Sequence, residues 1–155
     1  MKHNPINVFF GALVALFLLF VGFFFGTDFD LRLARQVKAE TLADSVTVSR
    51  VQPDIKFSEE FLQAFWSRQV TYSKNGVTSR EYHVKGMLYG AKFNGVVSDS
   101  GKWVSCEYGF GSTSHRFTHE SLKIDPNIPD WFREAFVSIA DSFVKVKNFE
   151  KMITV

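Results

Sequence analysis

The stretch from Val8 to Phe25 carries no charged side chain and almost no polar one, and it constrains the chain more than any other feature. As a helix, this stretch would extend about 27 Å, close to the ~30 Å hydrocarbon core of a bilayer. The sequence therefore predicts a short tail at residues 1–7 and a single transmembrane helix at residues 8–26.

A secretory signal peptide is the main alternative for this apolar stretch. Such a peptide has a shorter apolar segment and ends at a small-residue cleavage site. Here the stretch ends at Phe25-Gly26-Thr27-Asp28, and no Ala-x-Ala pattern follows closely. We therefore expect an uncleaved signal anchor.

The basic residues on either side of the apolar stretch give conflicting indications of orientation. Lys2 precedes the stretch, whereas Arg32, Arg35 and Lys38 follow it, and this count favours a domain that stays inside. A short Met-Lys tail before one apolar run is, however, the common form of an anchor whose C-terminal domain is exported. We expect a single-pass protein of the inner membrane with a periplasmic or otherwise extracytoplasmic C-terminal domain.

Small residues fall on one side of the predicted membrane helix, and most of its phenylalanines fall on the other. Close backbone approach through small residues favours packing between helices in lipid. The alternative is that glycine and alanine are simply common in membrane helices. The pattern predicts a helix-packing interface with another transmembrane protein or a second copy, and membrane lipid on the opposite side. Its residues are Gly11, Ala15, Gly22 and Gly26.

Composition excludes several classes of function. The formal net charge is +2 and no run of four basic residues occurs, so we expect no nucleic-acid partner. Cys106 is the single cysteine, which excludes an intramolecular disulfide.

Residues 27–56 read as a juxtamembrane helix and linker. Residues 29–44 are rich in helix formers, and Asp28 and Asp30 suit the beginning of such a helix. The valines between residues 46 and 51 then indicate a short strand or an extended linker.

We expect residues 57–155 to form a compact domain. Ser58 followed by two glutamates resembles an N-cap and a first turn, which predicts a short amphipathic helix near residues 58–67. Later in the chain, apolar residues at helical spacing predict a covering helix over residues 130–146.

The centre of the domain shows strand and turn signals. Asn75-Gly76 lies between alternating apolar residues, so it predicts a hairpin with a return strand at residues 82–88. Asn94-Gly95 indicates a turn or a bulge, and residues 99–101 a further turn. Strands are expected at 102–110 and at 115–119. The predicted class is α+β: a transmembrane helix, then an antiparallel meander of four to five strands and a C-terminal covering helix.

No pattern in the chain meets the requirements of a catalytic or metal site. His115 and His119 have the i, i+4 spacing of helical metal ligands, but on an extended chain they would lie about 13 Å apart. Cys106 falls on the apolar face of its predicted strand, where a thiol is usually inert. We expect no catalytic, cofactor-binding or metal-binding residue, no cofactor and no enzyme activity.

Two aromatic residues are candidates for a partner surface. Trp103 is expected on the strand face opposite Cys106, where it is either covered by a helix or exposed beside Tyr89. The sequence thus predicts a membrane-anchored, non-enzymatic subunit of a larger membrane or envelope complex of the secretion, conjugation, pilus or respiratory type. A membrane-anchored inhibitor, such as an immunity or entry-exclusion protein, is the alternative.

Overall fold

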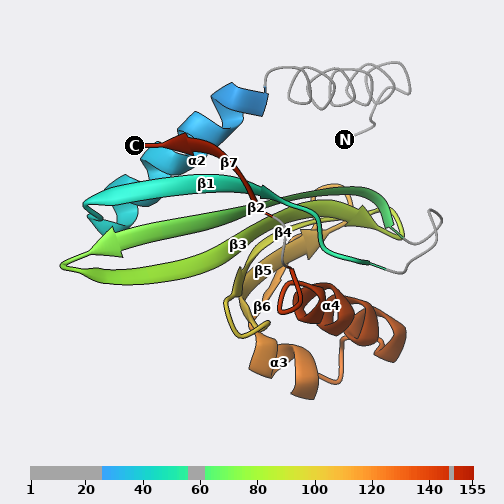
Figure 1. The fold of residues 1–155 in the computed structure, drawn as a ribbon. Coiled ribbons are helices and arrows are strands. Elements are labelled where there is room, and N and C mark those ends of the chain that lie inside the picture. The colour runs from blue at the N-terminus through green and yellow to red at the C-terminus, as the bar shows by residue number, and fades with distance from the viewer. Residues whose placement is uncertain (1–25, 56–61, 147–148) are drawn as a thin grey trace, which may run out of the picture.

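The computed structural model describes residues 26–55, 62–146 and 149–155, which form one antiparallel sheet with helices on both faces (Figure 1). The strand order across the sheet is β6-β5-β4-β3-β2-β1-β7. The first six strands form a continuous meander, and the last adds beside β1. The elements are α2 (Gly26–Thr41), β1 (Ser45–Val51), β2 (Leu62–Lys74), β3 (Val77–Leu88), β4 (Ala91–Ser98), β5 (Trp103–Gly109), β6 (His115–Phe117), α3 (His119–Ile124), α4 (Asp130–Ser142) and β7 (Phe149–Thr154).

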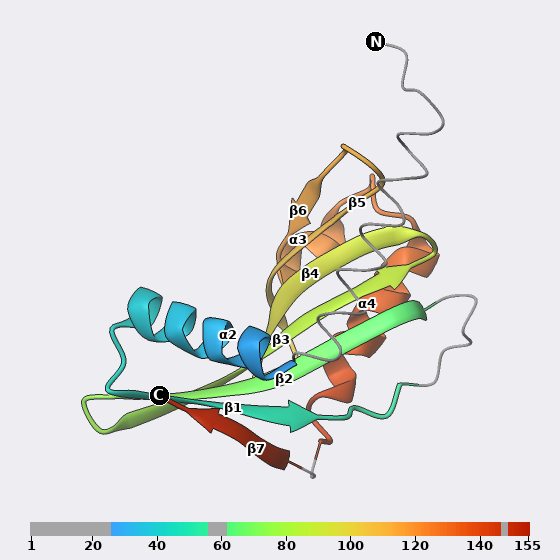
Figure 2. The same cartoon turned by 90° about the horizontal axis from the view of Figure 1, so that it is seen from above.

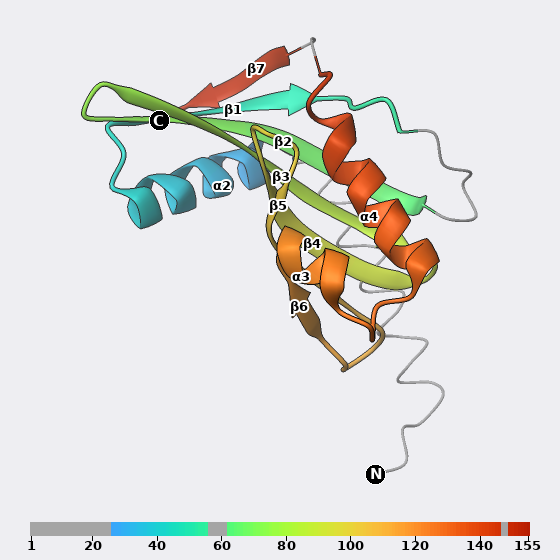
Figure 3. The same ribbon diagram turned by 90° about the horizontal axis from the view of Figure 1, so that it is seen from below.

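The larger core lies between α4 and one face of β3, β4 and β5 (Figure 3). Phe136 is fully buried at its centre, and the rings of Phe93, Trp103 and Phe117 meet it edge to face. The indole Nε1 of Trp103 donates to the carbonyl oxygen of Phe136 at 2.9 Å. The aromatic stripe of α4 thus determines which sheet face this helix covers.

The smaller core lies on the opposite face, where α2 packs over β1 and β7 (Figure 2). Val46, Val48 and Val70 form its floor. Beside it, the Arg68 Nε donates to Asp30 Oδ1 at 2.8 Å, and Asp30 is completely buried. This ion pair joins α2 to β2. The sequence suggested only that Asp30 suits the beginning of its helix. The ion pair shows that Asp30 also contributes to tertiary structure.

The predicted fold class is wrong. The described residues form a mostly β domain with seven antiparallel strands and small helices, and the α+β label fits it only loosely. The four- to five-strand count fails partly because no local pattern indicates β7. The short sequence of this strand contains Glu150 and Lys151, and it is positioned by pairing with β1, about a hundred residues earlier in the chain.

The predicted transmembrane helix gains no support from the structure. Across residues 26–55, 62–146 and 149–155, no helix is both long enough and apolar enough to cross a membrane. Gly26 begins α2, whose remaining residues include many charged side chains. The rest of the predicted helix, residues 8–25, lies outside the described residues.

Two local predictions fail because strand pairing overrides the local pattern. Residues 62–67, expected in a helix, begin β2 and pair with β3. Asn94-Gly95 is no turn, because both residues lie within β4 and pair with β3 and β5. A Cβ at Gly95 would lie 2.5 Å from the Ser105 carbonyl oxygen, so close packing of the backbone explains this glycine.

The helices at 29–44 and 130–146 are confirmed, with slightly different ends.

Candidate functional site

The α2 side of the sheet continues beyond α2 onto β3, β4 and β5, where no helix in the described part of the chain lies over it (Figure 2). We call this surface the open face and define it by Trp66, Lys85, Met87, Lys92, Asn94 and Glu107. These residues share one side of the sheet because directly paired residues of an antiparallel sheet point the same way. The open face is therefore the main polar surface built by the sheet.

One row of directly paired residues crosses the open face. It runs from Trp66 on β2 through Lys85, Asn94 and Glu107 to Arg116 on β6. Neighbouring strands lie about 4.8 Å apart, so side chains of different charge follow one another along the row at regular spacing. Positive, amide and negative groups follow one another on a rigid base.

Trp66 marks one end of this row and lies between two cations. The Arg68 guanidinium carbon is 4.9 Å from its ring centroid, and the Lys85 Nζ is 5.2 Å away. Cations over an indole face are attracted by its quadrupole. This contact places the Lys85 ammonium against the Trp66 ring.

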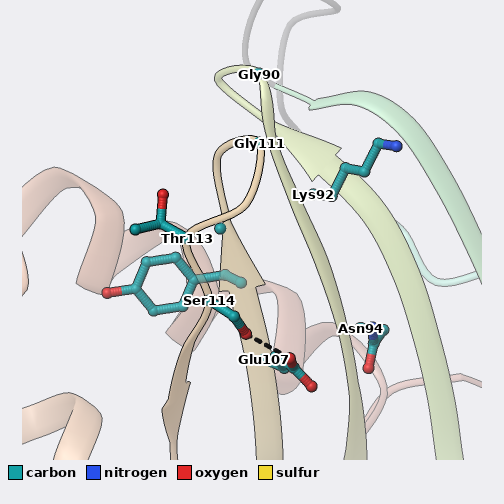
Figure 4. A pocket seen from close by; sticks show the side chains of 9 residues that line it. Gly90, Lys92, Asn94, Glu107, Gly111, Thr113 and Ser114 are labelled. Atoms are coloured by element: carbon teal, nitrogen blue, oxygen red, sulfur yellow. Dashed lines mark hydrogen bonds between the residues drawn. The ribbon is translucent and has the colours of Figure 1, made fainter. Parts of the chain in front are cut away.

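A shallow pocket of about 270 Å³ lies at the other end of the row (Figure 4). Lys92 and Asn94 come from β4, while Glu107 and Ser114 come from β5 and the loop after it. Gly109 allows this loop to fold back, because a Cβ there would overlap the Thr113 carbonyl oxygen. The remaining lining residues are Gly90, Tyr108, Gly111 and Thr113.

Glu107 is held in its ionised form inside the pocket. The Ser114 hydroxyl donates a hydrogen bond to its carboxylate (Figure 4), and this bond lowers the pKa of Glu107 more than any other contact. The Arg116 guanidinium, 3.6 Å from the carboxylate, lowers it further. Lys92 extends outward from β4 (Figure 4) and forms no ion pair with any described residue.

An aromatic patch adjoins the pocket, at the end of the sheet where β3 turns into β4. It consists of Tyr89, Phe110 and Trp131, whose exposed fractions are 39%, 57% and 49%. The Tyr89 and Trp131 rings meet edge to face with centroids 4.4 Å apart. Phe110 lies near Gly90, within 3.9 Å of the position that a Cβ would take there.

Tyr89 reaches this patch from an unfavourable backbone conformation. Its φ is +51° and that of Gly90 is +78°, the pattern of a two-residue hairpin turn with both positions left-handed. Glycine and asparagine suit such positions, whereas a bulky residue there is a genuine outlier. The Gln63 side chain supports the turn by accepting a hydrogen bond from the Gly90 amide at 2.9 Å.

The structure separates the two residues that the sequence proposed as a partner surface. Tyr89 lies in the aromatic patch, but Trp103 is 2% exposed and packs under α4. Val96 pairs with Ser105 and Val97 with Trp103, so Val104 is an extra residue in β5. This bulge turns Trp103 to the same side of the sheet as Cys106. Of the predicted helix-packing residues, Gly26 begins α2, whereas Gly11, Ala15 and Gly22 lie outside the described residues.

The residues considered for metal or thiol chemistry are dispersed. His115 lies on β6, while His119 begins α3 and accepts a hydrogen bond from the Trp103 amide at 3.4 Å. In the described parts of the chain, no three His, Cys, Asp or Glu side chains gather as metal ligands. Burial raises the pKa of the Cys106 thiol far above its ordinary value, which keeps it protonated and unreactive.

The comparisons with known proteins place no relative beside this chain: no family model, no curated protein and no solved structure matches it significantly. The sequence named Tyr89 as a candidate for a partner surface but did not point to Phe110, Trp131 or the polar row. A usable signal for the patch was present in Leu88-Tyr89-Gly90-Ala91, a tight turn with an aromatic residue where asparagine is preferred. The row depends on the register of five strands, which no local pattern shows.

Proposed function

We propose that this chain is a non-enzymatic subunit of a larger membrane or envelope assembly and that it binds a partner protein through the aromatic patch. The observation that carries the proposal is the exposed ring of Tyr89 at a backbone position that disfavours it. Exposed aromatic clusters of this kind are typical of the residues that dominate protein interfaces.

The balance of energies supports a binding role for Tyr89. A left-handed conformation costs an L-residue about 1–2 kcal/mol. The edge-to-face contact with Trp131 returns about 0.5–1.5 kcal/mol. Asparagine would form the same turn without most of the strain. Binding of a partner to the exposed part of the ring is a reason for a tyrosine at this position.

The membrane setting of the proposal rests on the apolar stretch from Val8 to Phe25. A chain of this composition is expected to associate with lipid, and we place the folded domain on the extracytoplasmic side. Its partner would then be a further membrane or envelope protein, or a second copy of this chain.

The test begins with the full-length chain, isolated with an affinity tag in mild detergent from cells that produce it at native level. A copurifying protein is identified, and its affinity for the purified chain is then measured. Trp131→Ala should weaken binding by about thirtyfold, as expected for the loss of about 2 kcal/mol at an interface hot spot. Association that is unchanged in Trp131→Ala would contradict the proposal.

Val77→Ala provides the matched control. Val77 is 66% exposed and begins β3, whereas Tyr89 follows the end of the same strand. The substitution removes exposed apolar surface, though less than Trp131→Ala does, at the opposite end of β3 from the patch. Partner binding should remain within about twofold of the parent chain, because isolated surface changes have small effects.

A further inference from the structure

Two lysines of the open face have no ion pair with any residue that the structure describes: Lys85 and Lys92. The other charges nearby are largely compensated. Arg68 is paired with Asp30 at 2.8 Å, and Glu107 with Arg116 at 3.6 Å. The region around Trp66 and the pocket therefore carries an uncompensated positive charge.

Among the residues that the structure describes, the remaining acidic group of this face lies away from the two lysines. Glu81 contacts His83 at 3.0 Å and is four residues from Lys85 along β3, about 13 Å away. It therefore does little to neutralise Lys85, and the lysine pair stays available to an external anion.

The register fixes the spacing between the backbone positions of the two lysines. Lys85 is paired with Asn94, and Lys92 lies two residues before Asn94 on β4. Diagonal neighbours of this kind lie about 7–8 Å apart. Side chains at positions i and i+2 of an extended chain are separated by nearly the same distance, about 6.6 Å.

We propose that the open face binds an extended acidic segment of a partner protein, with carboxylates at alternate positions that contact Lys85 and Lys92. Trp66 and Met87, both half-buried on this face, supply apolar contact beside the two cations. The inference rests on the proposed function, because it specifies the chemistry of the partner.

An acidic peptide fits this surface better than a nucleic acid does. A phosphate backbone needs a continuous basic track, and bases need free aromatic faces on which to stack. Here Glu107 interrupts the row, and Trp66 already has two cations over its ring. Two discrete carboxylates can contact Lys85 and Lys92 while avoiding Glu107.

The test uses capped pentapeptides and the full-length chain in detergent micelles, with binding read from the amide shifts of Lys85 and Lys92 at millimolar peptide. One peptide carries Glu-Ser-Glu at its centre and a second carries Glu-Glu-Ser, which directs the carboxylates to opposite sides. A third carries Gln-Ser-Gln and a fourth Lys-Ser-Lys. A short oligothymidylate forms a fifth arm.

We expect the Glu-Ser-Glu peptide to bind most tightly. Lys85→Gln and Lys92→Gln should each weaken it by about three- to fivefold, the range of exposed ion pairs. Glu107→Gln should strengthen it, because an opposing charge is lost while Ser114 can still donate to the amide oxygen. Lys74→Gln, at the far end of β2, should have no effect.

Equal binding of the Glu-Ser-Glu and Gln-Ser-Gln peptides would overturn the inference, as would tighter binding of the lysine peptide or the oligonucleotide, or no shift with any peptide. The proposed function has a separate readout. Loss of partner binding in Trp131→Ala together with unchanged binding in Lys92→Gln would reject the acidic segment and retain the aromatic patch.

Discussion

The two hairpin turns at opposite ends of β3 have nearly the same backbone but different residues. Asn75 and Gly76 have φ values of +53° and +79°, and Tyr89 and Gly90 have values of +51° and +78°. The first turn uses the pair that this geometry favours. The second uses a bulky aromatic residue at the position where asparagine serves best.

We interpret this difference as the consequence of the proposed binding role of the second turn. The Asn75 turn serves the fold, because its backbone N–H donates to the Asp44 carboxylate at 3.1 Å and joins the turn to the segment between α2 and β1. Tyr89 places a ring against Trp131, beside a polar pocket, and leaves part of that ring exposed. Strain that persists at a surface position is a recognised mark of functional sites.

The largest effect should come from Gly109→Ala, which disturbs only the Tyr89 end. The new methyl group would overlap the Thr113 carbonyl oxygen, so the loop that carries Phe110 must move. Overpacking of this kind costs about 1–3 kcal/mol, and we expect the upper part of that range in urea denaturation. Amide shifts should change around Thr113 and remain unchanged around Asn75.

Gly111→Ala is the control for this substitution. Gly111 has a φ of +58° but nothing within 4 Å of its added Cβ. The Gly111→Ala variant should lose only the part of its unfolding free energy that a left-handed backbone costs an alanine. A loss as large as that of Gly109→Ala would show that the close approach of Thr113 is unimportant.

Next in size are the paired substitutions Gly76→Ala and Gly90→Ala. Both glycines have the same φ and no close neighbour, so each should lose about 1–2 kcal/mol of unfolding free energy. The two losses should agree within about 0.5 kcal/mol if the turns are equivalent in backbone terms. A clear inequality would break the comparison between the turns.

Asn75→Tyr copies the second turn into the first. It should destabilise the protein by about 1 kcal/mol, because the left-handed region disfavours tyrosine. Chemical denaturation measures the loss. An unchanged stability would mean that Tyr89 is not strained either.

Mild acid should lower stability without acting through either turn. Burial, assisted by Lys123 and Lys102, lowers the pKa of His119 below its ordinary value of 6.5. Above pH 6.5 the imidazole is neutral in both states, whereas below it the unfolded chain takes up the proton first. Stability should therefore fall as the pH drops from 6.5 toward the folded-state pKa. His119→Gln should flatten this part of the profile measured by thermal melts.

The sequence predicted those parts of the fold that local signals determine. Asn75-Gly76 indicated the hairpin, the aromatic stripe from Phe132 to Phe143 indicated α4, and helix formers after Asp28 indicated α2. Each depends on residues that are close together in the chain. The helix expected near Ser58 failed after residue 61 because pairing with β3 outweighs a local capping pattern.

The candidate site was less accessible from sequence because it depends on register and on one bulge. The bulge at Val104 buries Trp103 and reverses the face that simple alternation assigns to this residue. Lys85, Asn94 and Glu107 meet only because three strands align. Tyr89 was a candidate from sequence, but its unfavourable backbone is evident only when its φ is compared with that of Asn75.

Tyr89→Asn tests the central claim most directly, with unfolding free energy and partner affinity measured on the same full-length protein. The substitution relieves about 1 kcal/mol of backbone strain and removes a ring contact of similar size, so stability should change by less than about 1 kcal/mol. Partner affinity should fall by about tenfold or more, as for other interface aromatics. A protein that loses stability but binds its partner as before would show that Tyr89 serves the fold, and would contradict the account.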